Sequence, residues 1–402
     1  MSPDADRPKR VLSLSTLYPN AHTPRFGTFV ARSLEALAKR DDWDVTVVNP
    51  IGIPPIAFGK YKPLAAAAVD GVENGVSVHR PKFTLIPSLG ARSNPGVIAR
   101  KVLPLVQQLH AEQAFDIIDA QFFYPDGPAA AWIAREMGLP CSIKARGSDI
   151  NFWGSKGFAR EQMLEAAEHA TGLLAVSEAL AREMSGLGMP YNKISLHYTG
   201  LDRDRFRPRA HEGLRLQLGK TLGIDLPETK PLLVSVGGLI ERKGQDLAIG
   251  ALASIPDAQL LLVGKGPDEK HLRNLTRDMR VDERVHFLGS VDHDLLPIIL
   301  SAADVMVLPS ASEGLANAWV ESLACGTPIV ISDAGGAREL VTSSDAGLIV
   351  DRNLDSVAGG VKALLANPPT TQQVTAMASR FSWEQNAAQL AEYYDRLIAA
   401  QA

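Results

Sequence analysis

Two glutamates eight residues apart, Glu313 and Glu321, stand where a predicted strand gives way to a predicted helix. The apolar run 303–308 has the length of a buried strand, and Pro309 and Gly314 end it. Glu313 is therefore expected in the loop and Glu321 in the helix, near the carboxyl end of a strand, where open α/β sheets bind ligands. Two such carboxylates could be the acid and nucleophile of a retaining glycosidase, or a solvated loop residue and a helix-surface charge.

The start of that helix offers backbone donors for an anion. Asn317 is the expected N-cap, and the N–H groups of Leu315, Ala316 and Asn317 follow Gly314 at the positive end of the helix dipole. The pair Gly335–Gly336 repeats this arrangement one strand later. Each helix start is therefore a candidate anion site.

A glycine turn in the second half suits a bound diphosphate. The segment 234–244, VSVGGLIERKG, contains a strand, a turn at Gly237 and Gly238, and the basic pair Arg242 and Lys243. Glycines let the backbone approach a ligand, and Lys243 supplies a point charge close to phosphate oxygens. Taken alone, the segment also fits an ordinary surface turn with a solvated lysine.

A second turn, Gly264-Lys265-Gly266, follows the strand-like run 260–263. It is not a Walker A loop, which needs Gly-x4-Gly-Lys followed by Ser or Thr. Because both turns and the helix start at 315–317 follow strands of one domain, together they favour a phosphorylated ligand.

Strand-like runs alternate with helical ones along the chain, which predicts an α/β protein with two doubly wound parallel-sheet domains. A polar stretch, 198–208, is broken by Gly200 and Pro208, and it separates a first domain at 1–205 from a second at 206–380. A closing helix with its own apolar face is predicted within 381–402. The predicted strands are 10–15, 44–49, 116–121, 141–145, 172–176, 232–236, 259–263, 285–288, 305–308, 328–331 and 347–350.

The composition is that of a soluble globular protein, with 46% apolar residues, 21% charged residues and a net charge of -4 in 402 residues. These values argue against a nucleic-acid binder or a disordered tail. Cys141 and Cys325 lie beside apolar runs, which predicts reduced core thiols. No apolar stretch suits a signal peptide or the ~20 residues of a spanning helix, so we expect a cytoplasmic protein with at most peripheral membrane contact.

Positive charge is concentrated between Gly59 and Lys101. Such a segment, rich in aromatic residues, suits an acceptor site at the inner face of an anionic membrane, for example for a lipid-linked glycan; a plain solvated surface is the alternative. The cations are Lys60, Lys62, Arg80, Lys82, Arg92, Arg100 and Lys101, against Asp70 and Glu73, with Phe58, Tyr61 and Phe83 beside them.

The chain resembles the retaining nucleotide-sugar glycosyltransferases of family 4 over nearly its whole length. Glu313-x7-Glu321 is similar to the acidic motif of that family, and EGLANAWVESLACGTPIVISDAGGARE to its surroundings. VGGLIERKG resembles the phosphate segment, LLVGKGPDEKHL the next strand, turn and helix, and FSWEQNAAQLAEYY the closing helix. In the first half, PRFGTFV resembles the glycine loop after the first strand, ARGSDIN the segment facing the donor sugar, and AVSEALAREM the following strand and helix.

The resemblance implies the GT-B fold, in which two Rossmann-like domains face each other across a cleft. The first domain would bind the acceptor, the second would bind the nucleotide sugar, and the closing helix would pack back on the first. The implied reaction is retaining transfer of a hexose to an acceptor hydroxyl, in polysaccharide or glycolipid assembly. The acceptor would attack on the face that the leaving group departs from, with the diphosphate helping to take the proton.

The resemblance also implies roles for single residues. Glu321 would accept hydrogen bonds from the ribose, Glu313 would hold hydroxyls of the transferred sugar, and Lys243 would stabilise the leaving diphosphate. The implied catalytic residues are Glu313, Lys243 and Arg146. The implied donor site also contains Gly238, Arg242, Gly264, Gly266, Gly314, Leu315, Ala316, Asn317 and Glu321, and the acceptor-side loop contains Arg25, Phe26, Gly27 and Asp149.

No metal site or other cofactor is expected. Asp202-x-Asp204 and Asp292-x-Asp294 match a metal-binding string, but the first lies in the linker and the second at a helix start, so we interpret both as structural. The nucleoside diphosphate sugar is the expected small-molecule partner.

Two positions depart from the family pattern. Gly238 stands where many members have an arginine, and Arg242 could compensate for the missing charge. Arg146 stands where many members have a histidine that contacts a sugar hydroxyl. We expect Arg146 to contact the donor sugar or its phosphate, favouring a uronic acid, unless it forms an internal ion pair with Asp149.

Three further functions share parts of this pattern. A dehydrogenase needs a Gly-x-Gly-x-x-Gly turn after an early strand, and neither 12–27 nor 234–244 contains one. A nucleotide-sugar epimerase of the same fold, or a non-catalytic nucleotide-sugar-binding protein, stays open. The glycosidase alternative leaves the phosphate-suited turns unexplained.

Overall fold

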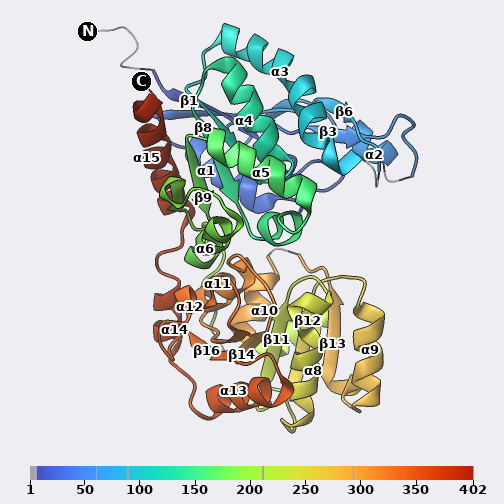
Figure 1. The fold of residues 1–402 in the computed structure, drawn as a ribbon. Coiled ribbons are helices and arrows are strands. Elements are labelled where there is room, and N and C mark those ends of the chain that lie inside the picture. The colour runs from blue at the N-terminus through green and yellow to red at the C-terminus, as the bar shows by residue number, and fades with distance from the viewer. Residues whose placement is uncertain (1–6, 60, 88–89, 211, 293, 402) are drawn as a thin grey trace. The chain divides into compact units, whose positions relative to one another are not determined.

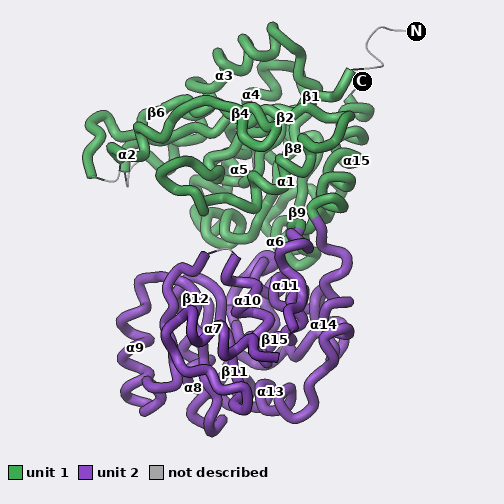
Figure 2. The backbone as a smooth tube through the Cα atoms, turned by 180° about the vertical axis from the view of Figure 1, so that it is seen from behind, with its two compact units in different colours: residues 1–200, 383–402 green, residues 201–382 purple. Residues whose placement is uncertain are grey.

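The computed structural model describes residues 7–59, 61–87, 90–210, 212–292 and 294–401. The chain forms two compact units: unit 1 contains Met1–Gly200 and Trp383–Ala402, and unit 2 contains Leu201–Ser382 (Figure 2). Each unit has a sheet of mostly parallel strands with helices on both faces (Figure 1). The predicted α/β fold with two doubly wound parallel-sheet domains is confirmed.

The sheet of unit 1 has the strand order β10-β9-β8-β7-β1-β2-β5-β4, and only β4 is antiparallel to its neighbour. Its central strands β7 and β8 are wholly buried, because helices cover both faces of the sheet. The order reverses between β1 and β7, so the loops after these two strands open at a switch point. The strands are β1 (Lys9–Leu14), β2 (Trp43–Val48), β4 (Gly71–Glu73), β5 (Val76–His79), β7 (Ile117–Ala120), β8 (Cys141–Ala145), β9 (Gly172–Ala175) and β10 (Ile194–Leu196), with β3 (Ile51–Ile53) and β6 (Lys82–Thr84) forming a separate pair.

Two helix layers bury the faces of this sheet. The long C-terminal helix α15 packs beside α1 on one face, where the rings of Trp43 and Tyr394 lie 5.4 Å apart. Helices α3, α4 and α5 cover the other face. The helices are α1 (Thr28–Ala38), α2 (Tyr61–Ala66), α3 (Asn94–Glu112), α4 (Asp126–Met137), α5 (Gly157–His169), α6 (Glu178–Leu187) and α15 (Trp383–Gln401).

Asn386 of α15 joins the two segments at which the chain leaves and re-enters unit 1. Its Nδ2 donates to the Tyr198 carbonyl at 2.6 Å, and its Oδ1 accepts from the Ser33 hydroxyl at 2.7 Å. Its own carbonyl lies 2.9 Å from His197 Nε2. This buried amide therefore ties α15 to α1 and to the last residues before unit 2.

We expect Asn386→Ala to destabilise unit 1 by about 2–4 kcal/mol, because it leaves buried donors and acceptors without partners. This corresponds to a melting midpoint about 5–10 °C lower for a unit of this size. Differential scanning calorimetry would measure it, with exposed Gln389→Ala on the same helix as the control. Equal midpoints for the two variants would contradict the clamping role of Asn386.

The sheet of unit 2 is wholly parallel, in the order β13-β12-β11-β14-β15-β16. Its switch point lies between β11 and β14. The strands are β11 (Leu232–Val236), β12 (Gln259–Val263), β13 (Val285–Gly289), β14 (Val305–Leu308), β15 (Ile329–Ser332) and β16 (Gly347–Val350). The helices are α7 (Leu214–Leu222), α8 (Gln245–Ala253), α9 (Glu269–Asp278), α10 (Leu296–Ala302), α11 (Asn317–Ala324), α12 (Ala337–Leu340), α13 (Leu354–Ala366) and α14 (Thr371–Met377).

Every predicted strand is present, with ends shifted by at most one residue. Both cysteines are free and buried, as predicted. The prediction of a basic surface between Gly59 and Lys101 is wrong for part of its members: Arg80 is buried and pairs with Glu73 at 2.7 Å, and Phe83 belongs to the core. Lys60 lies outside the described residues. None of the described helices is long and apolar enough to span a membrane.

Candidate active site

Glu313 lies in the loop after β14 and meets two cations from the loop after β11. Its Oε1 is 2.5 Å from Lys243 Nζ, and its Oε2 is 3.5 Å from Arg242 Nη1. The Glu313 side chain is only 9% exposed and that of Lys243 15%, so water screens this pair weakly. The structure thus brings together three predicted site residues at the switch point of unit 2.

Backbone contacts hold the two loops against each other. The N–H of Ala311 donates to the Arg242 carbonyl at 2.7 Å, and the Arg242 guanidinium donates to the Ser312 carbonyl. Gly244 has a left-handed φ of 73°, and a Cβ there would meet the Pro309 carbonyl oxygen at 2.5 Å. Lys243 is therefore positioned by a turn that tolerates no side chain at the following residue.

The start of α11 presents backbone N–H groups that no described residue uses. The groups of Leu315, Ala316 and Asn317 donate to no described carbonyl or side chain. The predicted N-cap is one residue off: Ala316 is the N-cap and Asn317 is the first helical residue, because Ala316 has extended backbone angles. The first turn of this helix is thus left to water or a ligand.

The second predicted anion site, at Gly335–Gly336, is wrong. The Gly336 N–H donates to the Gly314 carbonyl at 2.8 Å, and the Ala337 N–H donates to Ala334. A Cβ at Gly335, whose φ is 52°, would meet the Glu313 carbonyl oxygen at 2.1 Å. This turn packs against the backbone of the Glu313 loop, and the N–H groups of Gly336 and Ala337 already have backbone acceptors.

Glu321 lies inside α11, as predicted, and is half-buried. No described residue forms a hydrogen bond or ion pair with its carboxylate. Burial raises the pKa of Glu321 to about 7, because nothing offsets the loss of hydration of the charged form. An unpartnered, poorly hydrated carboxylate is suited to accept hydrogen bonds from ligand hydroxyls.

The turns at Gly264 and Gly238 pack back to back. A Cβ at Gly264 would meet the Gly237 carbonyl oxygen at 1.9 Å, and one at Gly266 would meet the Leu239 carbonyl oxygen at 2.0 Å. Both glycines are therefore required by this close backbone approach. Gly238 differs, because a Cβ there would lie no closer than 3.8 Å to any neighbour outside its own segment. The absence of an arginine at Gly238 is thus not imposed by space.

In unit 1, Arg146 follows β8 and is held by Gln121, the first residue after β7. Arg146 Nε donates to the Gln121 carbonyl at 2.8 Å, and Nη2 donates to Gln121 Oε1 at 2.5 Å. The guanidinium carbon lies 4.8 Å from the centre of the Phe29 ring. Burial lowers the pKa of Arg146 to about 10, so the side chain stays charged at neutral pH.

Asp149 is fully buried and does not pair with the Arg146 side chain. Its carboxylate accepts backbone N–H bonds from Phe123, Arg146, Gly147 and Ile150, at 2.8–3.1 Å. Burial raises its pKa despite these bonds. Asp149 therefore fixes the loop that carries Arg146, and the internal ion pair considered as an alternative does not form.

The predicted loop after β1 precedes α1. Gly27, with a φ of 73°, is the N-cap of α1, and a Cβ there would meet the Leu17 carbonyl oxygen at 2.4 Å. Phe26 is 52% exposed and Arg25 is also exposed. The structure places these residues at the switch point of unit 1, in the neighbouring loop to Gln121.

Sequence reasoning missed several buried polar groups in unit 1, among them Lys144, two residues before Arg146. Lys144 is wholly buried in β8, and its Nζ lies 2.7 Å from His197 Nδ1. Burial lowers the pKa values of both groups well below their ordinary ranges. Asp126, whose pKa burial raises to about 7, accepts from the Thr16 N–H at 2.8 Å. The only sequence signal was a lysine inside the predicted strand 141–145.

The two Asp-x-Asp strings meet at one arginine. Arg205 Nη2 lies 3.3 Å from Asp294 Oδ1, and its Nε lies 4.0 Å from Asp202 Oδ2. In the part of the chain that the structure describes, no group of three or more His, Cys, Asp or Glu side chains is arranged to hold a metal ion.

Comparison with known proteins finds a matching family model for each half of the chain. The family "Glycosyl transferases group 1" matches residues 223–389, and the family "Glycosyl transferase 4-like domain" matches residues 26–200. The putative teichuronic acid biosynthesis glycosyltransferase TuaC of Bacillus subtilis is 28% identical over 388 residues, which cover 94% of this chain and 90% of that protein. A second relative is the GDP-mannose-dependent alpha-(1-6)-phosphatidylinositol monomannoside mannosyltransferase of Mycobacterium tuberculosis. It is 35% identical over 222 residues, which cover 50% of this chain and 55% of that protein.

Solved structures show the same fold. Sucrose-phosphate synthase from Thermosynechococcus elongatus superposes with a TM-score of 0.77 at 21% identity, over 98% of this chain and 100% of that one. HepE of Anabaena, in complex with UDP, superposes with a TM-score of 0.74 at 22% identity. The match covers 96% of this chain and 100% of that one. These likenesses confirm the predicted GT-B fold. The chain belongs to the glycosyl transferases, its second half to group 1 and its first half to the glycosyl transferase 4-like domains.

Proposed function

We propose that this protein is a retaining, metal-independent hexosyltransferase that moves a sugar from a nucleoside diphosphate to an acceptor hydroxyl, in polysaccharide or glycolipid assembly. One observation carries the proposal: Lys243 and Arg242 converge on Glu313 beside the unused N–H groups of 315–317. Cations, amide donors and a hydroxyl acceptor then lie together at one switch point. In this reading unit 2 binds the donor and unit 1 supplies the acceptor side.

The donor would lie along the two glutamates. Glu321 accepts hydrogen bonds from the ribose hydroxyls, and Glu313 accepts them from the transferred sugar. Lys243 and Arg242 already lie beside Glu313, so they are in place to stabilise the charge that develops on the leaving diphosphate. Gly238, Gly264 and Gly266 shape the backbone around that position.

The same group of side chains supports the proposed retention and metal independence. Both carboxylate oxygens of Glu313 face cations, which suits a residue that holds hydroxyls better than one that attacks an anomeric carbon. The two cations and the amides of α11 supply the charge stabilisation that a divalent ion would otherwise give. The leaving diphosphate is then the group that takes the acceptor proton.

A lipid-linked or polymeric acceptor is supported by unit 1. Ile56, Phe58 and Ile86 are 77%, 70% and 51% exposed, and Lys62 and Lys82 lie exposed among them. Apolar side chains mixed with lysines favour contact with an anionic membrane surface. The two relatives described above are named for teichuronic acid and for a phosphatidylinositol mannoside, which fits a cytoplasmic enzyme acting at the membrane.

A screen of UDP- and GDP-sugars by thermal stabilisation, followed by transfer assays with candidate acceptors, tests the proposal. We expect one donor to raise the melting midpoint and then to be consumed only when an acceptor is present. Epimerised sugar released without an acceptor would indicate the epimerase alternative, and stabilisation without turnover would indicate a binding protein. Stabilisation by no nucleotide sugar would contradict the proposal.

The affinity for the nucleotide sugar should depend on the ionisation of Glu321. Since burial raises its pKa to about 7, the carboxyl is protonated in acid and loses the acceptor that the ribose hydroxyls need. We expect Kd to rise about tenfold as the pH falls from 8 to 6. The effect on folding stability has the opposite sign. Because burial raises the pKa of Glu321 in the folded state, protonation of this carboxyl favours folding at low pH, and that contribution to stability is lost as the pH rises through about 7.

Titration calorimetry between pH 6 and pH 8 would measure this dependence. The control is Glu321→Gln, which should bind more weakly but with a flat pH profile. An unchanged pH slope in this variant would assign the titration to another group.

A further inference from the structure

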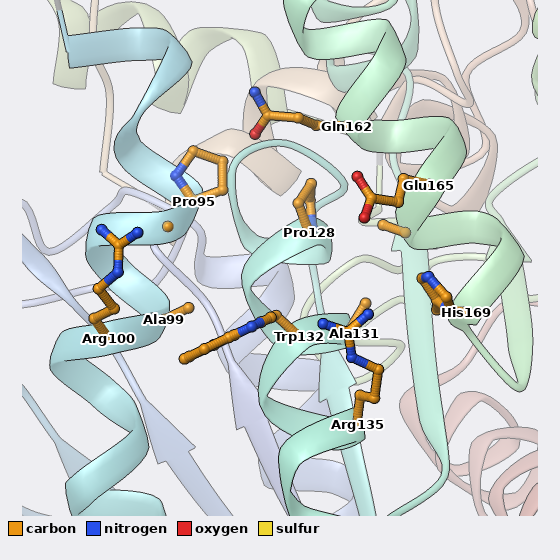
Figure 3. A pocket seen from close by; sticks show the side chains of 12 residues that line it. Pro95, Ala99, Arg100, Pro128, Ala131, Trp132, Arg135, Gln162, Glu165 and His169 are labelled. Carbon is orange, nitrogen blue, oxygen red and sulfur yellow. The ribbon is translucent and has the colours of Figure 1, made fainter.

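A hollow of about 290 Å³ lies on the outer face of unit 1, between α3, α4 and α5 (Figure 3). Small residues create it, because each of the three helices turns a short side chain toward the others. These residues are Gly96 and Ala99 of α3, Pro128 and Ala131 of α4, and Ala166 of α5. None of them belongs to the candidate active site.

Trp132 of α4 lines the hollow, with an arginine on either side. Figure 3 shows its ring between Arg100 of α3 and Arg135 of the next turn of α4. Neither guanidinium has a hydrogen-bond or ion-pair partner among the described residues. Two unneutralised cations flanking a flat aromatic wall suit a ligand that has an apolar face and negative groups on both sides of it.

The remaining lining is polar. Gln162, Glu165 and His169 of α5 close the hollow opposite α3 (Figure 3). An acyl chain would remove these groups from water without giving them partners, which costs free energy. A hydroxyl-rich ligand satisfies them, since hydroxyls donate to Glu165 and accept from the Gln162 amide or His169.

We propose that this hollow binds a segment of an acidic oligosaccharide, with one sugar ring packed on Trp132 and carboxylate or phosphate groups directed to Arg100 and Arg135. The inference rests on the proposed function and names the class of glycan that the enzyme handles. A glycan held on the outer helices would stay attached to the enzyme between successive transfers, because this second contact raises its effective concentration at the acceptor side.

Titration calorimetry of the full chain with tetragalacturonate tests the proposal, with maltotetraose as the neutral probe and inorganic phosphate as the small anion. We expect binding of tetragalacturonate only, weakened at least fivefold by Trp132→Ala and at least fivefold by the double variant Arg100→Ala/Arg135→Ala. Higher salt should weaken binding by the wild type more than by the double variant. Trp132→Phe, which keeps an aromatic face, should retain binding within threefold.

Arg182→Ala removes an exposed arginine from α6, another helix of unit 1, and serves as the matched control. Its affinity should stay within twofold of the wild type. Equal binding of the neutral probe, no binding of tetragalacturonate, or no effect of the hollow variants would overturn the proposal. Binding of anionic vesicles that requires Trp132, without oligosaccharide binding, would also overturn it and assign the hollow to lipid.

Donor stabilisation measured on the same samples separates this inference from the proposed function. A nucleotide sugar that stabilises the wild type and the hollow variants equally, while tetragalacturonate does not bind, would overturn only the glycan site. Loss of both signals in the wild type would overturn both.

Discussion

Replacing Glu313 with glutamine is expected to lower kcat/KM for sugar transfer by roughly 100- to 1,000-fold. The substitution keeps the shape of the side chain but removes the charge that Lys243 and Arg242 face at 2.5 and 3.5 Å. It also leaves Lys243, which is mostly buried, without its close anionic partner. A neutral amide cannot hold both the two cations and the hydroxyls of the donor sugar.

The matched control is Glu241→Gln, which removes an exposed carboxylate from the same turn as Lys243. This variant should keep activity within threefold. Initial rates with saturating acceptor and varied donor would measure both variants, and thermal midpoints would confirm that both are folded. Equal activity in Glu313→Gln and Glu241→Gln would remove Glu313 from the reaction and contradict the proposed use of the switch point.

Much of the fold could be predicted because its signals are local. Strands such as β12 and β14 are short, mainly apolar runs ended by Gly or Pro, and such runs need no distant partner to be recognised. Short strands such as β3 and β6 were missed, because three residues are too few to show the alternation of apolar and polar side chains that is typical of a strand. Their pairing depends on contacts between segments about 30 residues apart.

The predicted site could be placed at strand ends but not resolved into contacts. Spacing put Glu313 after β14 and Lys243 after β11, and only the strand order made them neighbours. Spacing also suggested a second anion site at Gly335–Gly336, but the N–H of Gly336 donates a hydrogen bond to the Gly314 carbonyl. A sequence shows which donors exist but does not show which of them another carbonyl has already taken.

The same limit applies to charge. Arg80 counted as surface charge in the sequence, yet Glu73 and two backbone carbonyls hold it in the interior. Conversely, Gln121 gave no signal, although it fixes the orientation of Arg146 through two hydrogen bonds. Residues that position others across a sheet become visible only when the strand neighbours are known.

Replacing Arg146 with alanine is expected to lower kcat/KM by roughly 10- to 100-fold, the value of a charge-assisted hydrogen bond of about 1.5–3 kcal/mol. The guanidinium is fixed by Gln121 and Phe29 and remains charged, while its Nη1 group has no partner among the described residues. A preorganised cation with unused donors is suited to a carboxylate or phosphate of the donor. The loss should therefore be larger with a uronic acid donor than with the matching neutral hexose.

Arg146→Lys and Arg146→His distinguish this role from a structural one. Lysine keeps the charge but not the fork, so it should restore part of the activity, whereas histidine should favour the neutral hexose over the uronate. Thermal midpoints close to the wild type would show that Gln121 and Phe29 still pack. Rates unchanged in Arg146→Ala for both donors would contradict the contact, and Arg146 would then serve only to brace the loops after β7 and β8.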